Sequence, residues 1–84
     1  MSELTIKIVS PQGLLFQGHC HMAVIPSTDG DAGIMRGHES MITSLRQGKI
    51  LICDDKENVV KNFDVESGFA EINEDSKLIV LLNQ

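Results

Sequence analysis

Two histidines flank a cysteine at His19, Cys20 and His21, and these side chain types can take part in a metal site. On an extended strand the two imidazoles point to one face and the thiol to the other, because successive side chains alternate. Such a pair of imidazoles could hold part of a zinc or copper site. The remaining ligands would have to come from His38, Asp29 or Asp31, and no spacing in the chain fixes them. We favour a solvated pair of histidines, with Cys20 in the core and no metal.

A serine, a histidine and an acid can be combined on paper into a catalytic triad, from Ser40, His38 and Asp31. Ser40 does not lie in the Gly-x-Ser-x-Gly turn that exposes a nucleophile, and a small domain offers little room for a substrate cleft. We therefore expect no catalytic residue and no cofactor. His38 is expected to cap a turn or to contact a partner.

Three glycines, Gly30, Gly33 and Gly37, punctuate a short polar segment. A phosphate-binding loop would need glycines that open a helix whose N–H groups face the anion. No helix-length pattern follows here, and the Lys and Ser/Thr of a P-loop are missing. The glycines therefore indicate tight turns and a bulge between short strands.

The composition is that of one small soluble domain spanning residues 1–84, with 42% hydrophobic and 23% charged residues. Twelve acidic against seven basic residues give a net charge of −5, which argues against a nucleic-acid partner. The longest apolar run, residues 78–82, is far shorter than the ~20 residues of a spanning helix. The amino terminus carries no secretory signal pattern. Cys20 and Cys53 are too few for a disulfide framework, so buried thiols in a reducing compartment are expected.

Short apolar runs separated by turn residues recur along the whole chain. Alternation of Leu4, Ile6 and Ile8 with other residues predicts a strand with one buried face. Further strands are predicted at residues 14–16, 19–25, 49–53, 59–63, 68–72 and 77–82. No window shows sustained helical periodicity, which predicts an all-β fold: a small β-sandwich of short, mostly antiparallel strands.

Three details of these strands follow from their residue types. Pro26 is predicted to end the strand at residues 19–25, because it cannot donate to a central ladder. Residues 41–45 fit either a strand or one helical turn. The nearly unbroken apolar run at the end of the chain predicts a strand buried on both faces.

The order of the motifs resembles the amino-terminal domain of the epsilon subunit of F-type ATP synthase. The motifs are Phe16-x-Gly18, Asp29-Gly30-Asp31-Ala32-Gly33-Ile34, Gly37-His38, Ile42-Thr43-x-Leu45, Gly48, Ser67-Gly68-Phe69-Ala70-Glu71-Ile72 and the strand at residues 78–82. The resemblance spans essentially the whole chain and is strongest over residues 30–48.

The resemblance implies a non-catalytic β-sandwich in the rotating central stalk, which binds the gamma subunit on one side and rests on the c-ring. It implies a peripheral position at the cytoplasmic face of the bacterial inner membrane, held there through the complex. By the same resemblance, Asp29, Gly30 and Asp31 match the loop presented to the c-ring.

The remaining matched positions concern the gamma subunit and the turns. Ser10, His38 and Thr43 match the gamma-facing side of the family, whereas Gly33 and Gly37 match structural turn positions.

Two departures from the family pattern matter. Ser40 stands where the family often has a proline, so that turn is expected to be less rigid. The family's carboxy-terminal helical hairpin, which inhibits ATP hydrolysis in many members, has no residues here. The chain is therefore either a natural short subunit or a piece of a longer one. The alternative to a rotor subunit is an unrelated acidic β-sandwich adaptor for another protein.

Overall fold

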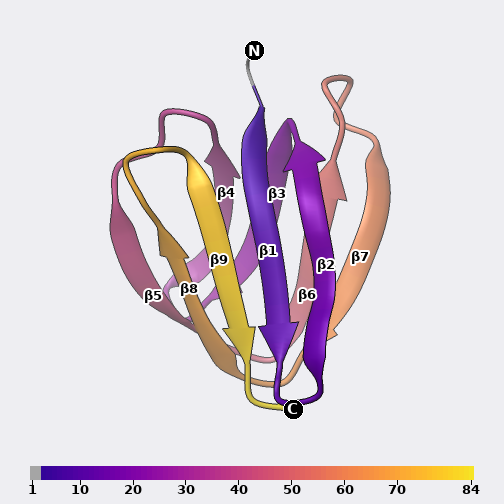
Figure 1. Cartoon of the computed structure of the whole chain (residues 1–84), viewed down its shortest axis with the longest axis vertical. Helices are drawn as coiled ribbons and strands as arrows, with labels where there is room; N and C mark the ends of the chain where they lie inside the picture. Colours follow the sequence, from indigo (N-terminus) through magenta and orange to yellow (C-terminus); the bar gives the residue numbers. More distant parts are fainter. Residues whose placement is uncertain (1–2) are drawn as a thin grey trace.

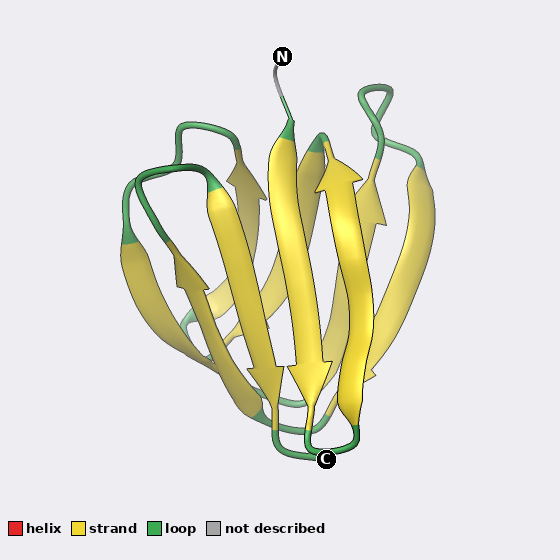
Figure 2. Cartoon of the chain, viewed as in Figure 1, coloured by secondary structure: helices red, strands yellow, loops and turns green. Residues whose placement is uncertain are grey.

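A computed structural model describes residues 3–84, and it places them in nine β-strands with no helix among the described residues (Figure 2). The strands are β1 (Leu4–Ser10), β2 (Gly13–Cys20), β3 (Met22–Ser27), β4 (Gly30–Met35), β5 (Met41–Leu45), β6 (Gly48–Cys53), β7 (Val59–Val65), β8 (Gly68–Ile72) and β9 (Lys77–Leu82). The predicted all-β class is confirmed.

The strands form two layers that face each other (Figure 1). Strands β2, β1, β9, β8 and β5 make the nearer layer, and β4, β3, β6 and β7 the farther one. The layers join where Ser27 of β3 pairs with Leu45 of β5. The described strands pair antiparallel except β1 with β9, which run parallel. This arrangement is the predicted β-sandwich of mostly antiparallel strands.

The core lies between the layers and is built from alternating side chains of each strand. Leu4, Ile6 and Ile8 of β1 are fully buried, as their spacing predicted. Ile25, Ile34, Ile50, Ile52, Ile72, Leu78 and Val80 complete most of the interior. At the open side between β2 and β7, the rings of Phe16 and Phe63 meet at 5.5 Å between centroids. Lys61 of β7 also lies over the Phe16 ring, with its Nζ 5.6 Å from the ring centroid, so an aromatic contact and a cation–π contact bridge that side.

The turns gather at two ends of the sandwich, because successive strands reverse direction. The lower end in Figure 1 holds residues 11–12, 28–29, 46–47, 66–67 and the last two residues of the chain. The upper end holds the start of β1 and the connections at residues 21, 36–40, 54–58 and 73–76. Ser76 ties the upper end together, because its hydroxyl accepts from the Gly37 N–H at 3.0 Å and its carbonyl from the Thr5 N–H at 3.1 Å.

The boundary between β2 and β3 differs from the prediction. The chain bends at His21, so His19 and Cys20 end β2 and do not share a strand with the following residues. Strand β3 then continues through Pro26, which was wrongly expected to end it. Proline is tolerated there because β6 pairs only as far as Val24, and β5 pairs first at Ser27.

The glycine-rich segment contains a strand that was not predicted. Gly33 lies in the middle of β4 opposite Val24, and its φ is not positive, so its assignment to a turn is wrong. Gly37 does lie in the turn after β4, with a φ of 86°. Residues 41–45, which fitted either a strand or a helical turn, form β5.

Strand β9 is buried on one face and not on both. Leu78, Val80 and Leu82 point into the core, whereas Leu81 is 50% exposed and Ile79 is half-buried. The apolar run therefore led to a wrong prediction of burial on both faces, because the outer side of this central strand is partly exposed.

Candidate functional site

The predicted acidic loop forms the lower corner where β3 turns into β4. Thr28 and Asp29 make a two-residue turn between the paired residues Ser27 and Gly30. Gly30 adopts a φ of 123°, a conformation that a side chain would strain. The turn is tied to the other layer because the Thr28 N–H donates to the Ser44 carbonyl at 3.0 Å. Asp29 is thus carried on a defined hairpin turn and exposed to solvent.

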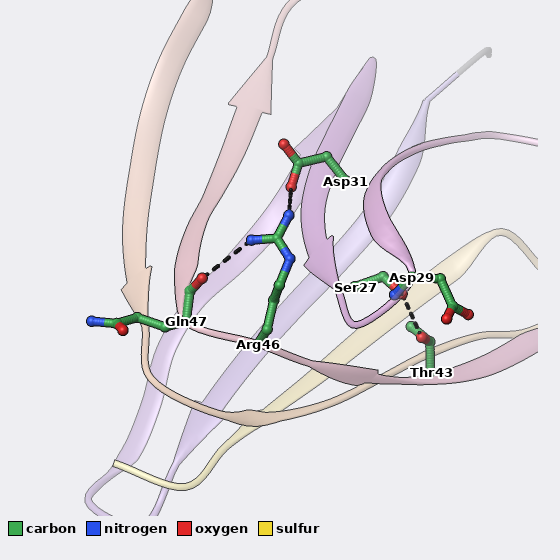
Figure 3. Close-up of polar contacts among 6 residues, drawn as sticks. All are labelled: Ser27, Asp29, Asp31, Thr43, Arg46 and Gln47. Carbon is green, nitrogen blue, oxygen red and sulfur yellow. Dashed lines mark hydrogen bonds and ion pairs between the residues drawn. The ribbon is translucent and has the colours of Figure 1, made fainter.

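A buried serine supports this turn from beneath (Figure 3). The hydroxyls of Ser27 and Thr43 share a hydrogen bond of 2.7 Å, and the Asp29 N–H points to Ser27 Oγ at 3.4 Å. Ser27 is only 5% exposed, so its hydroxyl depends on these partners. Thr43 therefore contributes to the shape of the acidic corner.

Asp31 is paired with a cation of the same chain. Arg46 Nη2 donates to Asp31 Oδ1 at 2.6 Å, and Arg46 Nη1 donates to the Gln47 carbonyl at 3.2 Å (Figure 3). The two side chains are 43% and 66% exposed, so solvent and salt screen the attraction. Asp31 is therefore partly neutralised, whereas Asp29 has no cationic partner among residues 3–84.

Ser10, predicted to face the gamma subunit, caps the turn between β1 and β2 at the lower end. Its hydroxyl donates to Gln12 Oε1 at 3.2 Å and accepts from the Gln12 N–H at 3.2 Å. The residue is 8% exposed. Gly13 completes the turn with a φ of 125°. The immediate role of the Ser10 side chain is thus to fix a turn.

His38 lies at the opposite end of the molecule. The backbone N–H of His38 donates to the Met35 carbonyl at 3.1 Å, and the ring Nδ1 of His38 lies 2.8 Å from the Glu39 carbonyl oxygen. The three predicted gamma contacts therefore do not form one cluster: Ser10 is at the lower end, His38 is at the upper end, and Thr43 bonds to Ser27 between the layers.

The histidine and cysteine cluster lies beside the β2–β3 bend. Among residues 3–84, no three His, Cys, Asp or Glu side chains are placed to hold a metal ion. His19 Nδ1 contacts Thr5 Oγ1 at 3.3 Å, and Cys20 and Cys53 are buried thiols. Burial, followed by the nearby Cys53 and Glu3, raises the pKa of Cys20 to about 11. Cys20 therefore stays a protonated thiol at neutral pH and is a poor nucleophile.

The hypothetical triad is not assembled either. Asp31 is at the lower end of β4 and bonded to Arg46, whereas His38 follows the upper end of the same strand. The corner as a whole offers a fixed, exposed carboxylate on a rigid turn, which suits docking to another protein and not bond-making chemistry.

The sequence of residues 3–84 matches the family described as the beta-sandwich domain of the ATP synthase delta/epsilon chain. This chain belongs to that ATP synthase family. An ATP synthase epsilon chain of Caulobacter vibrioides is 32% identical over 80 residues, covering 95% of this chain and 91% of that one. The epsilon chain of Campylobacter fetus is 34% identical over 86 residues, covering 99% of this chain and 63% of the relative. This epsilon-type chain thus spans nearly all of one relative but less than two thirds of another.

Solved structures share the fold. A chain of the Euglena gracilis mitochondrial ATP synthase, in a structure of OSCP, F1 and c-ring, superposes with a TM-score of 0.87. The match covers all of this chain and 52% of that one, at 16% identity. A chain of the Tetrahymena thermophila central stalk and c-ring gives a TM-score of 0.75, covering 96% and 63% at 10% identity. These likenesses show that the epsilon-type fold is retained where little sequence identity remains.

Sequence reasoning missed the two residues that organise the acidic corner, Ser27 and Arg46. A polar residue directly after the apolar run that ends at Pro26 was the available signal for Ser27. Arg46 pairs with Asp31 across 15 positions, and only the contact between β3 and β5 brings the two together.

Proposed function

We propose that this chain is a non-catalytic rotor subunit in the central stalk of a proton-translocating F-type ATP synthase. It links the gamma subunit to the c-ring and so couples proton flow to ATP synthesis. The observation that carries the proposal is the family match over residues 3–84, supported by an epsilon chain aligned over 91% of its own length. The described residues form a β-sandwich, so the role proposed for them is coupling, not inhibition of hydrolysis by a helical hairpin.

The acidic corner is the proposed contact with the c-ring. Asp29 is exposed on a turn that Ser27 and Ser44 hold in place, and Gly30 gives that turn its conformation. Asp31 is paired with Arg46, and a basic group of the partner could replace Arg46 in that ion pair. Exposed ion pairs of this kind give orientation more than affinity.

The proposed gamma contacts divide into two kinds. His38 presents a half-buried ring on the turn at residues 36–40, and we assign it a direct contact. Ser10 and Thr43 use their hydroxyls within the chain, so their effect on gamma binding would come from the shape of the neighbouring turns.

The position proposed for the subunit is peripheral, at the cytoplasmic face of a bacterial inner membrane. Within residues 3–84, the structure has no helix long and apolar enough to span a bilayer. Attachment through gamma and the c-ring is the mode of membrane association that the proposal requires.

The test is charge reversal at the acidic corner in the reassembled synthase. Asp29→Lys combined with Asp31→Lys should lower proton-driven ATP synthesis several-fold, while the variant chain keeps the thermal stability of the wild type to within a few degrees. Glu74→Lys combined with Asp75→Lys is the matched control, because it reverses two adjacent exposed acids at the upper end.

Three results would count against the proposal. Unchanged ATP synthesis in the corner variant would remove the c-ring assignment. An equal loss in the upper-end control would show a general charge effect. A wild-type chain that never co-purifies with the gamma subunit would favour the adaptor alternative.

A further inference from the structure

Two free thiols end strands that lie in opposite layers of the sandwich. Cys20 is the last residue of β2 in the nearer layer, and Cys53 is the last residue of β6 in the farther one. Both strands end at the upper end of the molecule (Figure 1), and the two residues are only 5% and 4% exposed. Neither cysteine belongs to the acidic corner or to the proposed gamma contacts, so the proposed function gives the pair no role.

The backbone holds the two cysteines within the span of a disulfide. The His21 N–H, which directly follows Cys20, donates to the Cys53 carbonyl at 3.1 Å. Standard bond lengths on either side of this hydrogen bond put the two Cα atoms about 5–7 Å apart. Disulfides usually join Cα atoms about 4.4–6.8 Å apart, so the bond needs no large movement of the backbone.

A hollow gives small molecules access to the pair. It measures about 330 Å³ and is lined by Glu3, His19, Cys20, His21, Cys53, Asp54, Asp55 and Val60. Its three carboxylates repel anions, so an uncharged molecule enters more readily than a negatively charged one. Its two imidazoles can accept and return a proton beside the thiols. The hollow therefore suits a small uncharged oxidant.

A bond between these cysteines would join the layers where the strands do not. Strands β2 and β7 end the strand order on the two sides of the opening. The rings of Phe16 and Phe63, together with Lys61, bridge that opening through side chains. The hollow, which is lined by His19 of β2 and Val60 of β7, lies at the upper end of the same opening. A covalent link there would fasten the open side of the sandwich.

We propose that Cys20 and Cys53 are a redox pair that forms a reversible intramolecular disulfide on reaction with a hydroperoxide. The Cys53 thiolate attacks one oxygen of hydrogen peroxide, the O–O bond breaks, and the leaving hydroxide takes a proton to become water. Cys53 is then a sulfenic acid. The Cys20 sulfur attacks the Cys53 sulfur, the S–O bond breaks, and the Cys20 proton goes to the leaving hydroxide to give a second water.

The order of the two steps follows from the surroundings of Cys20. Burial, followed by Cys53 and Glu3, raises the pKa of Cys20 to about 11, so this thiol stays protonated and attacks peroxide poorly. Cys53 is therefore the thiol that meets peroxide first, and Cys20 is the one that resolves the sulfenic acid. One peroxide is reduced to two waters while two thiols are oxidised to one disulfide, and an external dithiol reverses the change.

The first test treats the purified chain with hydrogen peroxide at about pH 8, where thiolates are more abundant than at neutral pH. The wild type should lose two hydrogen atoms in intact mass and give a peptide in which Cys20 is linked to Cys53. The thiols titrated in denaturant should fall from two per chain to none, and dithiothreitol should restore both. The disulfide should also raise Tm by at least about 5 °C, because it closes a long loop of the unfolded chain.

Single variants test the order of the steps. In Cys20→Ala the sulfenic acid at Cys53 has no partner thiol, so dimedone should trap it as an adduct. Cys53→Ala is the matched variant, and its remaining thiol should react at least ~10-fold more slowly, because Cys20 is held protonated. Thermal melts of both variants establish that they fold. Equal rates in the two variants would overturn the assignment of the first step to Cys53.

A second oxidant tests the charge of the hollow. Oxidised glutathione is an anion, so the carboxylates should slow its reaction with the folded chain more than they slow that of peroxide. The ratio of the peroxide rate to the glutathione rate should therefore fall at least about threefold when the chain is unfolded in urea. An unchanged ratio would contradict the selection of an uncharged oxidant.

Three results would overturn the redox pair itself. A folded wild type that keeps both thiols under peroxide, while the urea-unfolded chain loses them, would show that the pair is inaccessible. Disulfide-linked dimers would show that the bond forms between chains. A disulfide that lowers Tm would show that the native backbone does not fit the bond. None of these outcomes bears on binding to the gamma subunit, so the rotor proposal is tested separately.

Discussion

The two ends of the sandwich hold their acidic side chains in different ways. At the lower end, Asp29 and Asp31 lie on a hairpin fixed by Ser27 and by the Arg46 pair. At the upper end, acids far outnumber bases, with only Arg36 and Lys56 on the same connections. The upper acids are Glu3, Glu39, Asp54, Asp55, Glu57, Glu74 and Asp75.

This difference shows that the strongest negative charge and the best-defined acidic site are not in the same place. The molecule is 32 Å long, whereas charges in physiological salt are screened beyond about 8 Å. The upper acids therefore contribute little to a partner at the lower end. The binding role proposed for the lower corner therefore depends on the fixed positions of Asp29 and Asp31.

The largest expected effect concerns a glycine at the lower end. In Gly68→Ala the new Cβ would lie 2.2 Å from the Leu81 carbonyl oxygen, and a backbone atom cannot move aside as a side chain can. We expect a loss of more than about 3 kcal/mol in the free energy of unfolding, measured by urea denaturation. That loss is a large part of the stability of so small a domain.

The upper end provides the control for this prediction. Gly37 has a φ of 86° but open space around its Cα, so Gly37→Ala strains the backbone without a clash. A cost of about 1 kcal/mol is expected there. Equal losses in the free energy of unfolding for Gly68→Ala and Gly37→Ala would contradict the prediction, because the steric clash at Gly68 is expected to cost more than the backbone strain at Gly37.

The next effect tests the hydrogen-bonded support of the acidic corner. Ser27→Ala removes the 2.7 Å bond to Thr43 and the acceptor for the Asp29 N–H, which should cost about 1–2 kcal/mol. Ser44→Ala is the matched control, since Ser44 is exposed on the same strand as Thr43 and its hydroxyl makes no hydrogen bond to another residue in the described range 3–84. Scanning calorimetry of both variants measures these stabilities. A Ser27→Ala protein as stable as the wild type would show that the hydrogen bonds of Ser27 are not needed to stabilise the acidic corner.

Much of the fold follows from local patterns that a sequence contains. Alternation in β1 and turn residues between apolar runs sufficed to predict the class. Strand β4 was missed because glycines and acidic residues are typical of turns, and only the pairing with β3, which puts Gly33 opposite Val24, shows this segment to be a strand. The prediction that Pro26 ends its strand was also wrong. Whether β3 can contain a proline depends on where β6 and β5 stop pairing with it.

The site was predictable only to the level of its motif. Asp29, Gly30 and Asp31 were located by their order along the chain; Asp29 lies in the turn of the β3–β4 hairpin, and Gly30 and Asp31 begin β4. The Arg46 pair and the Ser27 support arise from contacts between β3, β4 and β5, which no local pattern encodes. Likewise, the apolar run of β9 did not reveal that its outer face is open.

The smallest expected effect is a pH dependence at the upper end. The Asp54 carboxylate accepts backbone N–H groups of Asn58 and Lys56, each at 2.9 Å, and these bonds hold its pKa below 3.8. A carboxyl whose pKa is lowered by folding stabilises the fold above its unfolded pKa, and that contribution disappears as pH falls through the folded value. The stability difference between wild type and Asp54→Asn should therefore be constant above pH about 5 and shrink below 3.8.

Urea denaturation between pH 2 and 7 measures this difference. Asn58→Ala is the matched control, because it removes only the 3.3 Å side-chain bond to Asp54 and keeps both backbone donors. It should retain most of the pH dependence. A difference between wild type and Asp54→Asn that does not vary with pH would show that the turn needs an acceptor and not a charge. The upper acids would then affect the protein only through their combined negative potential. The two ends would differ because hydrogen bonds fix the acidic side chains at the lower end alone.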